Sequence, residues 1–194
     1  MDFQTSRVWK DERNLVKKLY RNVTNTAQVR ELIFSAKLPF VLLNPKLIVD
    51  QFQVSIAVTR ALCNMKRNKM KTGSFPTEII YCLKPSKDIS EPLNHFSAQD
   101  GDTDVFIMGE KALWAKVGEQ ILGEEVNLDQ LSTFTDIPLV KKVYQIEEKV
   151  LQRVGSSLLE EVLIPMVCNE FTPSCFAMWS SKPNGNKIRP LLNR

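Results

Sequence analysis

The sequence predicts a single α+β domain, in which a mostly antiparallel sheet packs with helices, followed by a C-terminal tail. Apolar runs typical of strands and helical periodicities are intermixed along the chain, without the regular spacing of β-α-β units. A chain of 194 residues, 43% hydrophobic and 25% charged, is typical of a globular protein that buries its own core. Beyond residue 168 both periodicities are lost, so we expect a domain over residues 1–168 and a flexible tail over 169–194.

The first 45 residues are expected to form two strands and one helix. Residues 15–20 and 40–43 have the composition of short strands, and Pro45 ends the second strand. Between them, Asn25 can cap a helix, because Gln28 completes a capping-box pattern and apolar residues follow at helical spacing.

The clearest predicted helix begins after Asp50, which can cap its first turn. Apolar residues then recur at helical spacing and form one core-facing stripe: Val54, Ala57, Val58, Ala61, Leu62 and Met65. Farther on we expect, in order, a strand at Glu78–Lys84, a short helix after the Asp88–Glu91 capping pattern, a strand at Asp104–Met108, short helices at Asn127–Leu131 and Pro138–Ile146, and a longer helix from Glu147 to about Ile164.

Charge is unevenly distributed along the chain, although the net charge is only +4. Residues 51–77 contain five basic residues and no acid, whereas residues 100–136 contain nine acids and two lysines. A solvated surface explains such runs, and cations at a helix C-terminus also interact favourably with the helix dipole. The alternative is an anion site, for which nucleic acid is the preferred ligand. The residues predicted to bind nucleic acid are Lys66, Arg67, Lys69, Lys71, Lys84 and Lys87.

The sequence shows no pattern that indicates catalysis, a metal site or a cofactor. The single histidine, His95, lacks the neighbours of a catalytic or metal-binding histidine, and both phosphate-binding glycine motifs are absent. The four cysteines lack C-x-x-C spacing, so we expect reduced thiols, with Cys63 and Cys82 in apolar segments. No apolar run approaches the roughly 20 residues of a membrane span. We therefore expect a soluble, intracellular, non-catalytic chain without membrane contact.

Several sequence segments together resemble a known family. The segments VTNTAQVRELI, LLNPKLIVDQFQVSIAVTRAL and MKTGSFPTEIIYCLKPSKDISEPLNHF are similar to the PRPK-binding protein family, the kinase-associated subunit of KEOPS, and VKKVYQI and GSSLLEEVLI follow in the same order. The likeness covers residues 14–168. Gln51, Pro92 and the Ser97–Ala98 pair depart from the family pattern.

The resemblance implies a regulatory subunit that binds the N-terminal lobe of a small atypical kinase-like ATPase and meets the other KEOPS subunits indirectly. That complex makes the threonylcarbamoyl modification of the tRNA adenosine beside the anticodon. The resemblance also implies a cytoplasmic and nuclear location, and archaeal relatives imply contact with the tRNA acceptor end. Two other hypotheses remain open: a free-standing RNA-binding module that uses the basic cluster, and an enzyme without a detectable motif.

The last predicted helix suggests where a partner could bind. Five of its apolar residues span an arc of about 120°, which is enough for core packing. Leu159 and Leu163 extend the apolar face to about 220°, which suggests a second apolar surface. We therefore predict that the partner-binding residues are Leu159, Leu163 and Met166. The alternative is that another element of this chain covers that second face.

Overall fold

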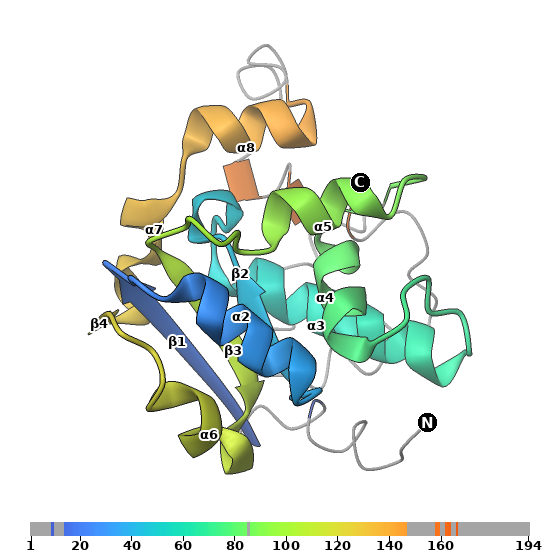
Figure 1. The fold of residues 1–194 in the computed structure, drawn as a ribbon. Coiled ribbons are helices and arrows are strands. Elements are labelled where there is room, and N and C mark those ends of the chain that lie inside the picture. Colours follow the sequence, from blue (N-terminus) through green and yellow to red (C-terminus); the bar gives the residue numbers. More distant parts are fainter. Residues whose placement is uncertain are drawn as a thin grey trace.

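Four antiparallel strands form an open sheet in the order β2-β3-β1-β4 (Figure 1). The computed structural model describes Trp9, residues 14–84 and 86–146, and the C-terminal positions 158, 159, 162, 163 and 166. The strands are β1 (Leu15–Arg21), β2 (Phe40–Leu43), β3 (Val105–Glu110) and β4 (Glu124–Val126). With the helices around them they confirm the predicted α+β class and the mostly antiparallel sheet.

Helices cover both faces of this sheet (Figure 1). The α-helices are α2 (Thr26–Ser35), α3 (Gln51–Lys66), α4 (Phe75–Leu83), α5 (Ser90–Phe96), α6 (Ala115–Gly118), α7 (Leu131–Phe134) and α8 (Ile137–Tyr144), with short 3-10 turns at Pro45–Leu47, Lys111–Leu113 and Leu128–Gln130. Successive strand residues point to opposite faces. Val41 and Leu43 therefore join the core beneath α3 and α4, whereas Phe40 and Leu42 join a smaller core beneath α2 and α6.

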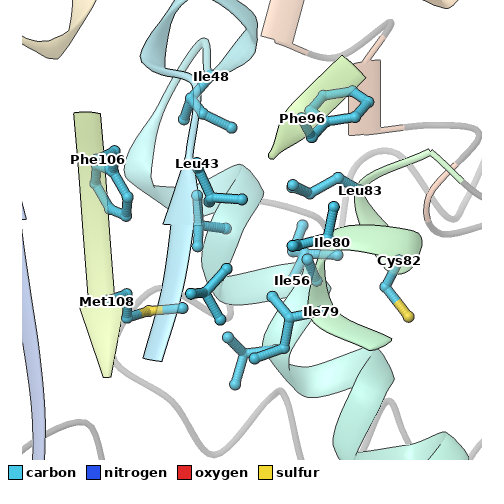
Figure 2. Close-up of a cluster of buried hydrophobic side chains, with 14 of the residues drawn as sticks. Leu43, Ile48, Ile56, Ile79, Ile80, Cys82, Leu83, Phe96, Phe106 and Met108 are labelled. Carbon is cyan, nitrogen blue, oxygen red and sulfur yellow. The ribbon is translucent and has the colours of Figure 1, made fainter. Parts of the chain in front are cut away.

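The main core lies between the sheet, α3 and α4 (Figure 2). Phe106 and Met108 of β3 belong to one cluster with Ile56 of α3 and Ile79 of α4, and all four side chains are fully buried. Burying a side chain of this size contributes about 1.5–3 kcal/mol. This core fixes α3 and α4 relative to the sheet, and these two helices carry the candidate functional surface described below.

Helix α3 forms as its sequence predicts. Asp50 caps it, because its Oδ1 accepts a hydrogen bond from the Phe52 backbone N–H at 2.7 Å. Twelve of its 16 residues are buried, so the helix is covered on more sides than the single predicted stripe requires. The buried polar Gln53 donates to the Tyr144 hydroxyl at 2.8 Å, and that hydroxyl donates to the Leu83 carbonyl at 3.0 Å. Burial raises the pKa of Tyr144, which keeps this link neutral.

Residues 78–84 form no strand, and this prediction was wrong. Residues 78–83 belong to helix α4, and Lys84 is its C-cap. The helix begins at a reciprocal capping box between Ser74 and Thr77, with Pro76 in the first turn. Ile79, Ile80, Cys82 and Leu83 are buried at helical rather than alternating spacing: Ile79 0%, Ile80 7%, Cys82 0% and Leu83 0% exposed. The capping signal and burial against α3 outweigh the strand propensity of the isoleucines and tyrosine.

Two smaller expectations also need correction. Asn25 precedes α2, but its side chain makes no cap and instead donates to the Gln120 carbonyl at 2.7 Å and accepts from the Leu122 N–H at 3.0 Å. Cys82 is buried and forms no disulfide, as expected, and its Sγ accepts a hydrogen bond from Asn64 Nδ2 at 3.8 Å. Cys63, in contrast, is disulfide-bonded, so the expectation of a reduced thiol was wrong there. The predicted long helix and the tail also lie outside the described residues, apart from the five helical C-terminal positions.

Gly109 is required by close packing across β2 and β3, where it pairs with Phe40. A Cβ at Gly109 would lie 2.1 Å from Phe40 Cδ1, and Phe40 is 2% exposed with its ring 6.1 Å from that of Trp114. We expect Gly109→Ala to lower the free energy of unfolding by about 1–3 kcal/mol through overpacking. Urea denaturation can measure this loss. The control is Gly101→Ala, whose Cβ would meet nothing within 4 Å; it should change the free energy of unfolding by less than about 0.5 kcal/mol. Equal stability of the two variants would show that the Phe40 ring moves aside.

Candidate RNA-binding turn and partner-binding residues

The turn between α3 and α4 gathers four of the predicted nucleic-acid-binding residues. Lys66, Arg67, Lys69 and Lys71 are all exposed on this segment, which we call the basic turn (residues 66–72). Lys66 lies in the last turn of α3, where the negative end of the helix dipole stabilises a cation. The structure therefore brings four cations together at one end of the α3–α4 pair.

The first half of the basic turn is fixed by the end of α3. Arg67 N–H donates to the Cys63 carbonyl and Asn68 N–H to the Met65 carbonyl, both at 3.1 Å. Asn68 adopts a left-handed conformation with φ 52°, and Lys69 N–H then reaches back to the Asn64 carbonyl at 2.8 Å. This pattern is the hydrogen-bonded helix terminus that an asparagine can support.

The second half of the basic turn is fixed by Glu78 of α4. The Glu78 side chain is 0% exposed, and its Oε2 accepts from the backbone N–H groups of Lys71 and Thr72 and from the Thr72 hydroxyl, each at 2.9 Å. Its Oε1 accepts from Asn64 Nδ2 at 2.7 Å. A buried carboxylate is tolerated when its oxygens are fully hydrogen-bonded, as they are here.

Lys84 and Lys87 lie away from the basic turn, at the opposite end of α4. That helix has nine residues and is about 13 Å long. Lys84 donates to the carboxylate of Glu91, which also accepts from the Ser86 hydroxyl. Hydrogen bonding to Lys84, and then to Ser86, lowers the pKa of Glu91. The predicted cluster of six basic residues is thus two groups, and Lys84 is already paired within the chain.

The predicted partner-binding residues do not share one exposed surface. Leu163 is 2% and Met166 0% exposed, and both pack in the main core together with Val162. Leu159 is half-buried at the edge of that core, as is Leu158. The second apolar face is therefore covered by this chain at Leu163 and Met166, the alternative left open by the sequence. Kinase binding by these residues stays a prediction, and Leu159 is the one that keeps exposed surface.

Arg60 of α3 holds the C-terminal helical residues in place. It is 8% exposed, and its guanidinium donates to the Met166 carbonyl oxygen. A buried guanidinium is tolerated when it is hydrogen-bonded, and the Met166 carbonyl supplies such an acceptor. Sequence reasoning placed Arg60 only in the basic run and missed this structural role.

The structure offers little acid–base or metal chemistry in the part of the chain that it describes. His95 is exposed on α5, and no group of three or more histidine, cysteine or acidic side chains could hold a metal ion among the described residues. Among the described helices, none is long and apolar enough to cross a bilayer. Sequence reasoning also missed Glu78, although it is the first acid after the acid-free residues 51–77 and could have been found by that position.

Comparisons with known proteins identify the family. The model of the family described as kinase binding protein CGI-121 matches residues 20–168. The EKC/KEOPS complex subunit TPRKB of Danio rerio is 32% identical over 133 residues, which cover 66% of this chain and 76% of that protein. The EKC/KEOPS complex subunit CGI121 of Kluyveromyces lactis is 34% identical over 89 residues, covering 46% and 55%, and that of Candida glabrata is 23% identical over 155 residues, covering 76% and 87%. These matches confirm the resemblance found in the sequence, and the chain belongs to the CGI-121 family of kinase-binding proteins.

Proposed function

We propose that this protein is the kinase-binding subunit of a KEOPS complex and that it binds the N-terminal lobe of a small atypical kinase-like ATPase. The observation that carries the proposal is the family match over residues 20–168, which includes nearly all the described elements. Similar proteins from fish and yeasts are named as EKC/KEOPS subunits. In this role the protein supports the threonylcarbamoyl modification of the tRNA adenosine beside the anticodon, in the cytoplasm and nucleus, and catalyses no reaction itself.

Purification of the native complex tests this role directly. A tagged chain, isolated from its own cells, should retain a small kinase-like ATPase together with the other KEOPS subunits, identified by mass spectrometry. Loss of the modification from tRNA after depletion of this chain is the second expected result. Recovery of the chain alone, with normal levels of modified tRNA after depletion, would contradict the proposal.

Leu159 is the residue we propose to contact the kinase. It is half-buried and adjoins the main core, so part of its side chain remains available to a partner. We expect Leu159→Asp to lower the amount of co-purified kinase at least about tenfold, because a charged group would be desolvated in an apolar interface. The isolated variant should stay folded, with a melting temperature only a few degrees lower, because Leu159 already meets solvent.

A matched control uses Phe34 on α2, the most exposed large apolar side chain among the described residues at 88%. Phe34→Asp should leave both folding and kinase co-purification unchanged if the interface lies at the C-terminal helix. If Phe34→Asp removes the kinase and Leu159→Asp does not, the kinase binds across α2 instead. Unfolding of isolated Leu159→Asp would mean that Leu159 serves the core.

We further propose that the basic turn contacts the acceptor end of tRNA. Four exposed cations lie on six consecutive positions, Lys66 to Lys71, the densest run of basic residues in the described part of the sequence. Phosphate contacts supply most of the affinity for nucleic acid. The same turn is the specific observation that favours the second candidate function, a free-standing RNA-binding module. Tight tRNA binding by the isolated chain, without any kinase-like partner in the native purification, would favour that alternative.

A further inference from the structure

Glu78 links the basic turn to the body of the protein through four hydrogen bonds. Three of them come from residues 71 and 72 of the turn, and the fourth comes from Asn64 in the last part of α3. Because the carboxylate is 0% exposed, water does not compete for these bonds. Glu78 thus fixes the turn from the protein interior, and a ligand bound at the surface of the turn would not contact its carboxylate.

Other hydrogen bonds fix the two ends of the same turn. Asn68 and Lys69 are anchored to the end of α3, as described above. At the other end Ser74 caps α4, and its Oγ accepts a hydrogen bond from the Thr77 backbone N–H at 3.3 Å. With Glu78 between these anchors, the backbone that carries Arg67, Lys69 and Lys71 has one defined path.

We propose that Glu78 is a positioning residue: it holds the basic turn in one conformation, and that conformation sets the affinity of the turn for RNA phosphates. This inference rests on the proposed tRNA contact. A preorganised turn loses less conformational entropy when it binds, so its cations bind phosphates more tightly than the same cations on a flexible loop.

Electrostatics alone predicts the opposite effect of removing Glu78. Its negative charge lies beneath four exposed cations and lowers the positive potential that attracts phosphates. If Glu78 acted only through charge, replacing it with a neutral residue would strengthen tRNA binding. If Glu78 acts by positioning, the same replacement weakens tRNA binding in spite of the extra positive charge. The sign of the change therefore separates the two roles.

The experiment compares Glu78→Met with Glu78→Gln, since both variants remove the same charge. Glutamine keeps an acceptor oxygen for the N–H groups of Lys71 and Thr72, whereas methionine, of similar length, offers no comparable acceptor. Binding of an unmodified tRNA transcript is measured by fluorescence anisotropy well below the melting temperature of each variant. We expect Glu78→Met to bind at least about fivefold more weakly than wild type, and Glu78→Gln to restore most of this loss.

Hydrogen exchange gives a readout that does not need RNA. The amides of Lys71 and Thr72 donate to Glu78, so their exchange should accelerate at least about tenfold in Glu78→Met, while amides in β3 stay protected. If Glu78→Met does not fold, Thr72→Val removes one donor to the carboxylate without any change in charge, and should weaken tRNA binding in the same direction.

The possible failures are distinguishable. Equal or tighter tRNA binding by Glu78→Met, or unchanged exchange of the two amides, would overturn the positioning role and leave the tRNA contact in place. Absence of tRNA binding by the wild-type chain would instead remove the proposed tRNA contact, and with it the consequence drawn for Glu78. Weaker binding and faster exchange in Glu78→Met, both restored by glutamine, would support the inference.

Discussion

Replacing Leu163 with alanine is expected to lower the free energy of unfolding by about 2–5 kcal/mol, the range for truncating a buried leucine. Leu163 is 2% exposed and packs in the main core, where Arg60 also binds the neighbouring Met166 carbonyl. The same core contains the buried side chains of α3, α4 and the sheet, and such close-packed elements relax only partly, so the cavity cannot close completely. Urea denaturation followed by circular dichroism measures the loss.

Leu159→Ala is the matched comparison, because it removes the same atoms one helical turn earlier. Leu159 is half-buried, so we expect a loss of less than about 1.5 kcal/mol for the isolated chain. For kinase binding we expect the opposite order: Leu159→Ala should weaken binding more than Leu163→Ala does, when both variants are folded. Equal losses of stability would mean that Leu159 and Leu163 are buried to the same degree in solution.

The sequence was sufficient for the elements whose signals agree with one another. Asp50 and the apolar stripe of α3 indicate the same helix, and the proline that follows residues 40–43 ends a strand that the structure confirms as β2. Residues 78–84 were misread because Ile79 and Ile80 favour strands when taken alone. The capping pair Ser74 and Thr77 lies just before them and favours a helix. Burial against α3 also follows the helical period, so these residues form a helix and not a strand.

The candidate site was less predictable, because its contacts join positions that sequence spacing does not relate. Lys84 and Lys71 look equivalent in the sequence, but only Lys84 is paired with an acid, Glu91, that folding brings to it. Glu78 was placed at the start of a predicted strand, and no spacing in the sequence relates it to Lys71 and Thr72, whose N–H groups donate to it. Likewise, helical periodicity showed that the last helix has a wide apolar face, but it could not say whether a partner or this chain covers Leu163.

Helix α3 connects the two candidate surfaces. Arg60 binds the carbonyl of Met166, and Asn64, one turn farther along the same helix, binds Glu78 beneath the basic turn. Residues spaced by four lie on one face of a helix. The C-terminal helical residues and the basic turn are therefore held by neighbouring side chains of one rigid element, so their relative position is set by the fold, and a kinase and a tRNA bound to them would be fixed relative to each other.

Removing three cations from the basic turn should cause a large, salt-dependent loss of tRNA affinity. Each phosphate contact to single-stranded RNA contributes about 0.7 to the slope of log K against log salt. Together, Arg67→Ala, Lys69→Ala and Lys71→Ala should therefore flatten the slope by up to about 2.1. The ratio of wild-type affinity to variant affinity should then fall roughly twentyfold between about 50 and 200 mM salt. Filter binding across that salt range measures both quantities.

The control for this triple variant is Lys84→Ala with Lys87→Ala. These residues were predicted to act with the basic turn, but they lie at the other end of α4 and Lys84 is paired with Glu91. We expect this double variant to flatten the slope by no more than about 0.7, the share of Lys87 alone. A loss of about 1.4 would show that both lysines contact phosphates and that tRNA extends along α4. An unchanged slope in the triple variant would place any tRNA contact outside the basic turn.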